Sequence, residues 1–236
     1  MLIFVTATRK SRYEFDKCPL GQSLRRMSFD KLLELFVITE NSSGLPAVYN
    51  KVINEQYREH QAVFLHDDVW LVDIFSSWRI RQGLEHFDVI GLAGNRVLRP
   101  DSPAWHVKDD TMEIDAGNLS GMVCHGATPF GVPSIFGSTP ARVQLLDGVL
   151  IAARISSLLD AGIRFDERFD FHFYDLDFSR QTNVAGLAVG TWPISITHTS
   201  VGAFGSDSWK RSLRLYRDKW GKHIADIGDR TKGNPK

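Results

Sequence analysis

Cysteines and long apolar runs are both scarce in this chain of 236 residues. Its two cysteines, Cys18 and Cys124, match no spaced metal-binding motif, and no local pattern marks either as a nucleophile. We therefore expect reduced, intracellular thiols rather than a disulfide framework. No apolar run approaches the roughly 18 residues of a membrane-spanning helix, and residues 1–8 lack the basic flank of a signal peptide. The sequence thus predicts a soluble, cytoplasmic protein.

An excess of charge of one sign is missing as well, and so are two common phosphate-binding motifs. Lysine plus arginine total 28 and aspartate plus glutamate total 28, so no global field favours DNA or RNA, and nucleic acid is not expected as a partner. The chain contains neither a GxGxxG fingerprint nor the lysine motif of a P-loop. A dinucleotide fold of the usual kind and a P-loop fold are therefore not supported.

Strand and helix signals alternate in the first part of the chain. Leu2–Thr6 and Phe36–Thr39 carry strand patterns, and Pro19–Leu35 between them has apolar residues at helical spacing. A short helix around Pro46–Glu55 and a third strand ending at His66 follow. This βαβαβ order predicts an α/β fold with a mostly parallel central sheet and a nucleotide-binding half.

The tripeptide His66-Asp67-Asp68 directly follows the apolar run at 62–65. In an open α/β sheet, ligands bind at the carboxyl ends of the strands. Two adjacent carboxylates beside an imidazole suit a hard divalent cation, which is most useful when the ligand carries phosphates. The tripeptide therefore predicts a metal and a nucleotide diphosphate at this edge. As an alternative, two acids after a strand often serve only as a helix N-cap.

The rest of the chain shows no internal repeat and no low-complexity linker, so we expect one domain. Residues 91–140 are rich in Gly, Pro, Ser and Asp, which predicts long functional loops and short strands. The strand patterns Ala141–Leu145 and Val149–Ala153, joined by the tight turn Asp147-Gly148, predict a hairpin.

A second group of acids lies between Arg164 and Phe178, where four aspartates stand among five phenylalanines. These aspartates are Asp166, Asp170, Asp175 and Asp177. Burial raises the pKa of a carboxyl group and makes its anion a better proton acceptor near neutral pH. A metal site and a separate base are the minimum needed to displace a phosphorylated leaving group. As an alternative, Asp175 and Asp177 are turn residues or partners of Arg164, Arg168 or Arg180.

Together these features resemble a known family. The resemblance rests on the βαβαβ order, His66-Asp67-Asp68, Val143–Gly148, Phe165-Asp166-Glu167 and Tyr174-Asp175-Leu176-Asp177-Phe178, and it covers Leu2 to about His198. In these features the chain resembles the family 2 glycosyltransferases of the GT-A fold. It is most similar to a small bacterial branch that carries an HDD variant of the DxD motif.

The resemblance implies transfer of a sugar from a nucleotide-diphosphate sugar, with a UDP-sugar as first choice, to a hydroxyl of a glycan or lipid-linked acceptor, as in polysaccharide synthesis. It implies a divalent metal, Mn²⁺ or Mg²⁺, on Asp68, with His66 or Asp67 assisting and His198 as a late metal or diphosphate ligand. Asp175 becomes the general base of an inverting displacement, with Asp177 as the other candidate. The implied nucleotide-binding residues are Thr6, Ala7, Glu40, Asn50 and Asp67.

Two positions depart from the family pattern. Position 66 is His where the common motif has Asp, which leaves the metal geometry open, and Tyr174 stands where a Glu usually precedes the base. Each implied role also has a structural alternative. His198 can be a hydrogen-bonded structural histidine, Asn50 can cap a turn, and Glu40 can be a solvated loop acid.

The resemblance also divides the chain into parts. We expect a single domain over residues 1–227, with a nucleotide-binding half at 1–90, an acceptor half at 91–205, a C-terminal helix at 206–227 and a disordered tail at 228–236. The helix pattern over Ser206–Ile224 has a basic face and an aromatic stripe. The stripe predicts core packing, and the alternative is peripheral contact with the inner face of a membrane.

Two other functions stay open at this point. A nucleotidyltransferase or nucleotide-sugar hydrolase would use the same metal and would need a phosphate clamp, for which Arg9, Lys10 and Arg12 are candidates. A non-catalytic subunit would bind a nucleotide without turnover. For a bound sugar, the candidate contacts in the loop region are Trp105, His106 and His125, and ordinary loop packing is the alternative.

Overall fold

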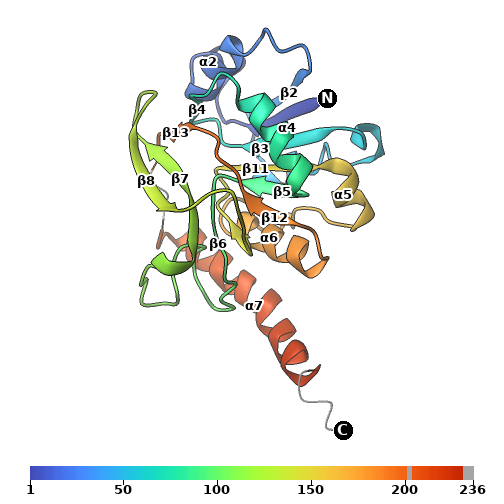
Figure 1. Ribbon diagram of the computed structural model, residues 1–236, viewed down its shortest axis with the longest axis vertical. Coiled ribbons are helices and arrows are strands. Elements are labelled where there is room, and N and C mark those ends of the chain that lie inside the picture. Colours follow the sequence, from blue (N-terminus) through green and yellow to red (C-terminus); the bar gives the residue numbers. More distant parts are fainter. Residues whose placement is uncertain (201–203, 231–236) are drawn as a thin grey trace.

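Two β-sheets that share one hydrophobic core form the body of the protein (Figure 1). The computed structural model describes residues 1–200 and 204–230. The larger sheet has the strand order β2-β1-β3-β11-β5-β12-β9. Its strands are β1 (Leu2–Ala7), β2 (Leu33–Ile38), β3 (Gln61–Leu65), β5 (Val89–Gly91), β9 (Ala141–Arg142), β11 (Leu150–Arg154) and β12 (Val189–Thr191).

The smaller sheet has the order β10-β6-β7-β13-β4, with β8 paired to β7. Its strands are β4 (Val69–Leu71), β6 (Ala93–Asn95), β7 (Leu119–His125), β8 (Val132–Gly137), β10 (Leu145–Leu146) and β13 (Ile196–His198). The β7–β8 hairpin stands out at one side of the molecule (Figure 1). It is the main regular structure within residues 91–140, for which the sequence predicts loops and short strands.

Helices surround the larger sheet (Figure 1). They are α1 (Arg12–Phe15), α2 (Pro19–Arg26), α3 (Leu45–Tyr49), α4 (Ser76–His86), α5 (Ile155–Asp160), α6 (Tyr174–Val184) and α7 (Asp207–Arg230), with 3₁₀ turns at Glu55–Tyr57 and Ala116–Asn118. Two short helices begin at clear caps. Ser11 and Glu14 form a capping box at α1, and Pro19 is the first residue of α2.

The predicted βαβαβ half is confirmed. β1 pairs in parallel with both β2 and β3, and its six residues are all buried, as expected for a parallel strand covered on both faces. β5 and β12 run in the same direction as these strands, whereas β11 and β9 run against them. The central sheet is therefore mostly parallel, as predicted.

Two predicted helices are too long. The helix predicted over Pro19–Leu35 ends at Arg26, because Leu33–Ile38 pairs in parallel with β1 and becomes an edge strand instead. The helix predicted around Pro46–Glu55 ends at Tyr49 and is followed by a separate 3₁₀ turn. In the first case, pairing with a distant part of the chain overrides the local helical spacing.

The predicted hairpin across Asp147-Gly148 is wrong. β9 pairs with β12, β10 pairs with β6, and β11 pairs with β3 and β5, so the strands on the two sides of the turn belong to different sheets. The turn residues therefore lie at a crossing between the two sheets. This position brings Asp147 and Gly148 to the functional site described below.

The C-terminal helix begins where the sequence predicts. Ser206 accepts a hydrogen bond from the backbone N–H of Trp209 at 3.2 Å, and Tyr216 and Trp220 are buried in the core. The aromatic stripe is therefore core packing. The exposed side chains of this helix include Lys210, Arg211 and Arg214, and a membrane contact through them stays a prediction.

The predicted tail at 228–236 starts too early. Residues 228–230 still belong to α7, and residues 231–236 lie outside the described part of the chain. Among the described helices, none combines the length and the apolar character needed to cross a bilayer.

Candidate active site

The loops that follow β1, β2 and β3 meet at one edge of the larger sheet. The carboxylate of Asp67 accepts hydrogen bonds from the Thr8 hydroxyl at 2.5 Å and the Lys10 ammonium at 2.6 Å. The backbone N–H of Glu40 donates to the carbonyl of Lys10 at 2.9 Å. These contacts bring two predicted nucleotide-binding residues, Glu40 and Asp67, to the end of β1, whose last two residues are the other two, the buried Thr6 and Ala7.

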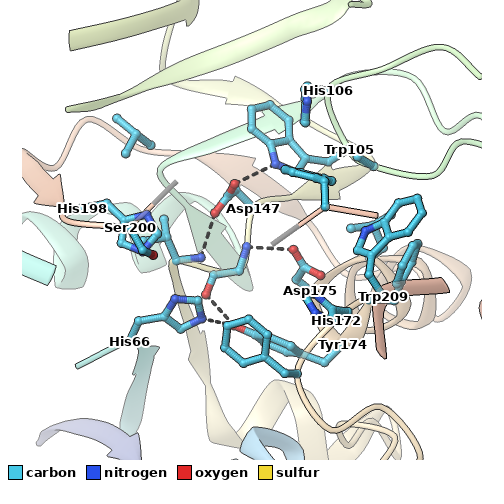
Figure 2. A pocket seen from close by; sticks show the side chains of 18 of the residues that line it. His66, Trp105, His106, Asp147, His172, Tyr174, Asp175, His198, Ser200 and Trp209 are labelled. Atoms are coloured by element: carbon cyan, nitrogen blue, oxygen red, sulfur yellow. Dashed lines mark hydrogen bonds between the residues drawn. The ribbon is translucent and has the colours of Figure 1, made fainter. Parts of the chain in front are cut away.

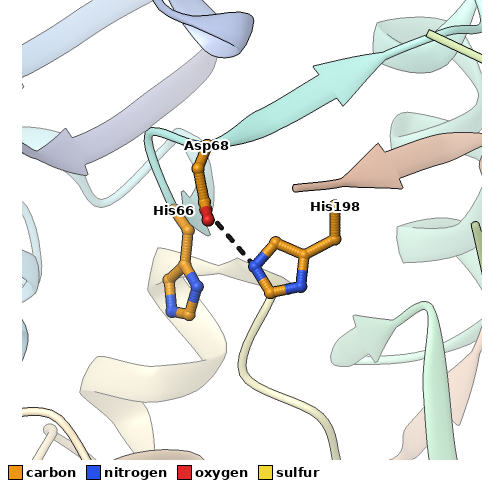
Figure 3. A group of neighbouring side chains, drawn as sticks. All are labelled: His66, Asp68 and His198. Atoms are coloured by element: carbon orange, nitrogen blue, oxygen red, sulfur yellow. Dashed lines mark ion pairs between the residues drawn. The ribbon is translucent and has the colours of Figure 1, made fainter. Parts of the chain in front are cut away.

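Asp68, directly before β4, faces His198 at the end of the paired strand β13 (Figure 3). Asp68 Oδ1 lies 3.3 Å from His198 Nε2, and the backbone N–H of Thr199 donates to the carbonyl of Asp68 at 3.1 Å. Burial opposes the charged form of Asp68, but the hydrogen bond from His198 and the nearby His66 hold the pKa of this carboxyl well below its usual range. Asp68 is therefore an anion at neutral pH.

His66, Asp68 and His198 can act together as metal ligands. One donor atom from each lies within 4.8 Å of the others. The Tyr174 hydroxyl donates its proton to the carbonyl of Gly148 at 2.6 Å, so in its 3.0 Å contact with His66 the ring Nε2 must be the donor. Burial lowers the pKa of His66, so the ring is neutral and its Nδ1 keeps a lone pair. A ring fixed through its second nitrogen in this way fits a metal ligand.

A cavity of about 300 Å³ opens beside these residues (Figure 2). His66 and His198 line it on one side, and Asp175 and Trp209 line it on the other. Its wall also includes all three predicted sugar contacts of the loop region, Trp105, His106 and His125. Two of the three candidate metal ligands, His66 and His198, and a candidate base therefore share one space.

Asp175 lies in the first turn of α6, directly behind the Gly148 backbone. Its Oδ2 accepts a hydrogen bond from the backbone N–H of Gly148 at 3.0 Å. Burial and the negative charge of Asp147 raise the pKa of Asp175 to about 7. A carboxylate with this pKa can take up a proton from a substrate hydroxyl near neutral pH.

Asp147 is a site residue that the sequence analysis missed. It accepts hydrogen bonds from the indole N–H of Trp105 at 2.7 Å and from the backbone N–H of Val149 at 2.8 Å (Figure 2). Its side chain lines the cavity beside Asp175. In the sequence, Asp147-Gly148 carries only the signal of a tight turn, so nothing local indicated a functional acid.

The side chain of Asp177 points away from the cavity that Asp175 lines. Its side chain is buried against α7, where it contacts the ammonium of Lys219 at 2.6 Å and the indole N–H of Trp220 at 2.8 Å. Asp166 also joins Lys219, at 2.8 Å, and Asp170 is exposed. Within the described residues, Asp175 is thus the one acid of the aromatic segment that lines the cavity.

Asn50 ties two loops together. Both hydrogens of its amide are used, by the carbonyl of Phe165 and by the carboxylate of Glu167, each at 2.9 Å, and its oxygen accepts from the Phe165 backbone at 3.0 Å. The residue is 6% exposed. These contacts are bonds between distant segments rather than a turn cap, and they occupy both amide hydrogens.

The candidate phosphate clamp is mostly engaged with acids. Lys10 pairs with Asp67 at 2.6 Å and Arg12 pairs with Asp16 at 3.2 Å, whereas Arg9 is exposed. A nucleotidyltransferase reaction therefore gains little support from this loop.

Comparison with protein families gives one match. The model of the "Glycosyltransferase like family" matches residues 4–199, which include every candidate site residue named above. No curated protein matches the chain.

Comparison with solved structures finds several that are similar to this chain, and two TarS structures among them share its fold. S. aureus TarS, residues 1–349, is 15% identical with a TM-score of 0.53, over 92% of this chain and 65% of that chain. A second S. aureus TarS structure is 16% identical with a TM-score of 0.53, over 93% of this chain and 39% of that chain. The mannosyltransferase PcManGT from Pyrobaculum calidifontis, in complex with GDP-Man and Mn²⁺, is 13% identical with a TM-score of 0.49, over 99% of this chain and 65% of that chain.

This chain thus spans less than two thirds of the length of these solved proteins, and identities this low bear on the fold alone. The βαβαβ half, the mixed second sheet and the match over residues 4–199 agree with one another. The chain therefore belongs to the glycosyltransferase-like family and has the GT-A fold.

Proposed function

We propose that this protein transfers a sugar from a nucleotide-diphosphate sugar, with UDP-sugars as the first donors to test, to a hydroxyl group of an acceptor. The observation that carries the proposal is the shared cavity, in which His66 and His198 line one side and Asp175 lines the other. A donor bound with its diphosphate at the histidines would present its anomeric carbon toward the base.

Asp68, His66 and His198 would hold the divalent metal. Two imidazoles and one carboxylate suit Mn²⁺ better than Mg²⁺, which prefers oxygen ligands, so we propose Mn²⁺. When bound, the metal takes up the negative charge that the diphosphate gains on leaving.

The nucleotide would lie along the edge formed by Thr6, Ala7, Glu40 and Asp67. Asp67 contacts Thr8 and Lys10 through Oδ2, and among the described residues its Oδ1 has no hydrogen-bond partner. That oxygen is the natural acceptor for a ribose hydroxyl. We do not include Asn50, because its amide is already used.

Asp175 would act as the general base. The acceptor hydroxyl gives its proton to the Asp175 carboxylate while its oxygen bonds to the anomeric carbon. The bond from that carbon to the diphosphate oxygen breaks, and its electron pair leaves with the diphosphate. Because Asp175 takes a proton and forms no bond to the sugar, one displacement occurs and the anomeric centre is inverted.

The anomeric configuration of the product tests this step. We expect an α-linked UDP-sugar to give a β-glycoside, assigned by the proton coupling at the anomeric carbon in NMR spectra. A product that retains the α configuration would contradict the role of Asp175 as base. Transfer that proceeds unchanged after removal of divalent metal with EDTA would contradict the role of Asp68, His66 and His198.

A further inference from the structure

The part of the cavity beyond Asp175 is walled by aromatic rings. Trp105 stands edge-on to Phe136 with 4.9 Å between ring centroids, and Trp209 lies against Phe173 at 5.5 Å. On the opposite side of the cavity, Phe171 stacks on His66 with 5.4 Å between ring centroids and is 48% exposed, so part of its ring remains open to a ligand. Rings held in place by their neighbours offer flat apolar surfaces that suit the C–H faces of a pyranose.

The charge of the wall is negative. Among the described residues, the lining contains two carboxylates, Asp147 and Asp175, and no lysine or arginine. The nearby Lys219 is directed at Asp166 and Asp177 instead. An anionic group such as a phosphate or a uronic acid would meet like charges here and no counter-ion, because the metal ligands face the proposed diphosphate site.

Three imidazoles supply neutral hydrogen-bonding groups. His106, His125 and His172 line the cavity. The Nδ1 atoms of His106 and His125 are buried and have no hydrogen-bond partner among the described residues. Burial lowers the pKa of His106 and of His172, so these rings are neutral. A neutral imidazole offers one N–H donor and one acceptor nitrogen, which matches a hydroxyl group that both donates and accepts.

We propose that the acceptor group entering this cavity is an uncharged sugar, and that sugars bearing a phosphate or a carboxylate group are selected against. The inference rests on the proposed function and names its acceptor class. Aromatic faces would bind the ring, the free imidazoles would bind its hydroxyls, and the acidic wall would exclude anions. The reactive hydroxyl would lie at Asp175.

The test measures release of nucleoside diphosphate from UDP-sugars by the Mn²⁺-loaded protein, with water alone and with added acceptors. The acceptors are methyl glucoside, methyl galactoside and methyl N-acetylglucosaminide, each matched with its uronate or its 6-phosphate. We expect at least one neutral glycoside to raise the rate above hydrolysis and its charged counterparts to be weaker by about tenfold or more.

Two variants test whether the acceptor binds to an imidazole of this cavity. His172→Phe keeps an aromatic ring and removes the hydrogen-bonding nitrogens, so we expect the KM for the neutral acceptor to rise by about tenfold with UDP binding retained. His86→Phe is the matched control, because His86 is an exposed imidazole that stacks on Trp192 outside the cavity. This control should leave the acceptor KM unchanged.

The outcomes separate the inference from the proposed function. If no nucleoside diphosphate binds with Mn²⁺, the proposed function fails and the inference fails with it. If UDP binds but no neutral glycoside accelerates its release, or if a charged sugar, a polyprenyl phosphate or a peptide hydroxyl works as well or better, only the inference is overturned. An equal rise in acceptor KM in both histidine variants would also overturn it.

Discussion

Asp175 destabilises the fold in the charge state that its proposed role requires. Its pKa is raised from 3.8 to about 7, first by burial and then by Asp147. Below pH 4 the group is protonated in both the folded and the unfolded chain. As the pH rises from about 4 to about 7, the unfolded chain loses this proton before the folded chain does, so the free energy of unfolding falls. Above pH 7 this free energy falls no further on account of Asp175.

The variant Asp175→Asn should therefore be more stable than the wild type at pH 8 and equally stable at pH 4. We expect a gain of about 1–3 kcal/mol at pH 8, because the amide keeps the hydrogen bond from Gly148 and carries no charge. The turnover number should fall by about 10²–10⁴-fold, as for loss of a general base. Chemical unfolding at both pH values and initial rates measure the two effects.

Asp170→Asn is the control for this substitution, since Asp170 belongs to the same segment but is exposed. It should change neither stability nor turnover. Wild-type turnover in Asp175→Asn would contradict the role of Asp175 as the base. A loss of stability in this variant at pH 8 would contradict the argument that burial of the charged Asp175 destabilises the fold.

Asp175 and Asp177 have opposite surroundings because they are two residues apart on one helix. Such side chains point about 200° apart, so one faces the cavity and the other faces α7. Asp177→Ala should lower the free energy of unfolding by about 3 kcal/mol, since it leaves the buried ammonium of Lys219 with Asp166 alone. The folded fraction should keep most of its turnover. Loss of turnover without loss of stability would instead favour Asp177 as the base.

At the scale of elements, the crossing between β10 and β11 determines the geometry of the site. A Cβ at Gly148 would lie 2.6 Å from the Tyr174 hydroxyl and 2.9 Å from the Asp175 Cβ. Gly148→Ala should therefore displace both side chains and disturb the contact between Tyr174 and His66. We expect a loss of about 1–3 kcal/mol of stability and weaker binding of Mn²⁺, measured by unfolding and by metal titration.

Gly117→Ala is the matched control, because a Cβ there meets no atom within 4 Å. Its stability should be unchanged or slightly raised. Equal effects of the two substitutions would show that the crossing at Gly148 does not constrain the site.

The segment between β10 and β11 also shows which feature of the fold could not be predicted from the sequence, namely the pairing of these strands. The βαβαβ half was predictable because buried parallel strands are short, apolar and locally recognisable, and their carboxyl ends meet at one edge. The hairpin prediction failed because an Asp-Gly turn has the same local signature within one sheet and between two sheets. Which strands pair with β10 and β11 depends on residues distant in sequence, such as those of β6 and β3.

The site residues show the same contrast between local patterns, which the sequence reveals, and contacts between distant residues, which it does not. His66 and Asp68 were found from the position of their tripeptide after a strand, and Asp175 and His198 were assigned through the family resemblance. The structure places them around one cavity or directly behind it. Asp147 was missed because its function depends on Trp105, a residue 42 positions away. Asn50 was assigned to the nucleotide because the sequence does not reveal that its amide is already used by Phe165 and Glu167.

At the scale of the whole molecule, the candidate metal site forms only when the two sheets pack together. His66 directly follows β3 of the larger sheet, whereas Asp68 directly precedes β4 and His198 ends β13, which are paired strands of the smaller sheet. Because the unfolded chain does not hold these ligands together, a metal and nucleotide that bind there must stabilise the whole fold. Global unfolding is therefore a direct readout of the site.

The most direct test is thermal unfolding with UDP and Mn²⁺, alone and together, in the wild type and in Asp68→Ala. A ligand at 100 times its dissociation constant adds about 2.7 kcal/mol, which raises the Tm of a chain of this size by about 5–10 °C. We predict this rise for the wild type with UDP and Mn²⁺ together and none for Asp68→Ala, with Asp170→Ala behaving as the wild type. A wild type that shows no rise, or an Asp68→Ala protein that shows the same rise, would contradict the proposed donor site.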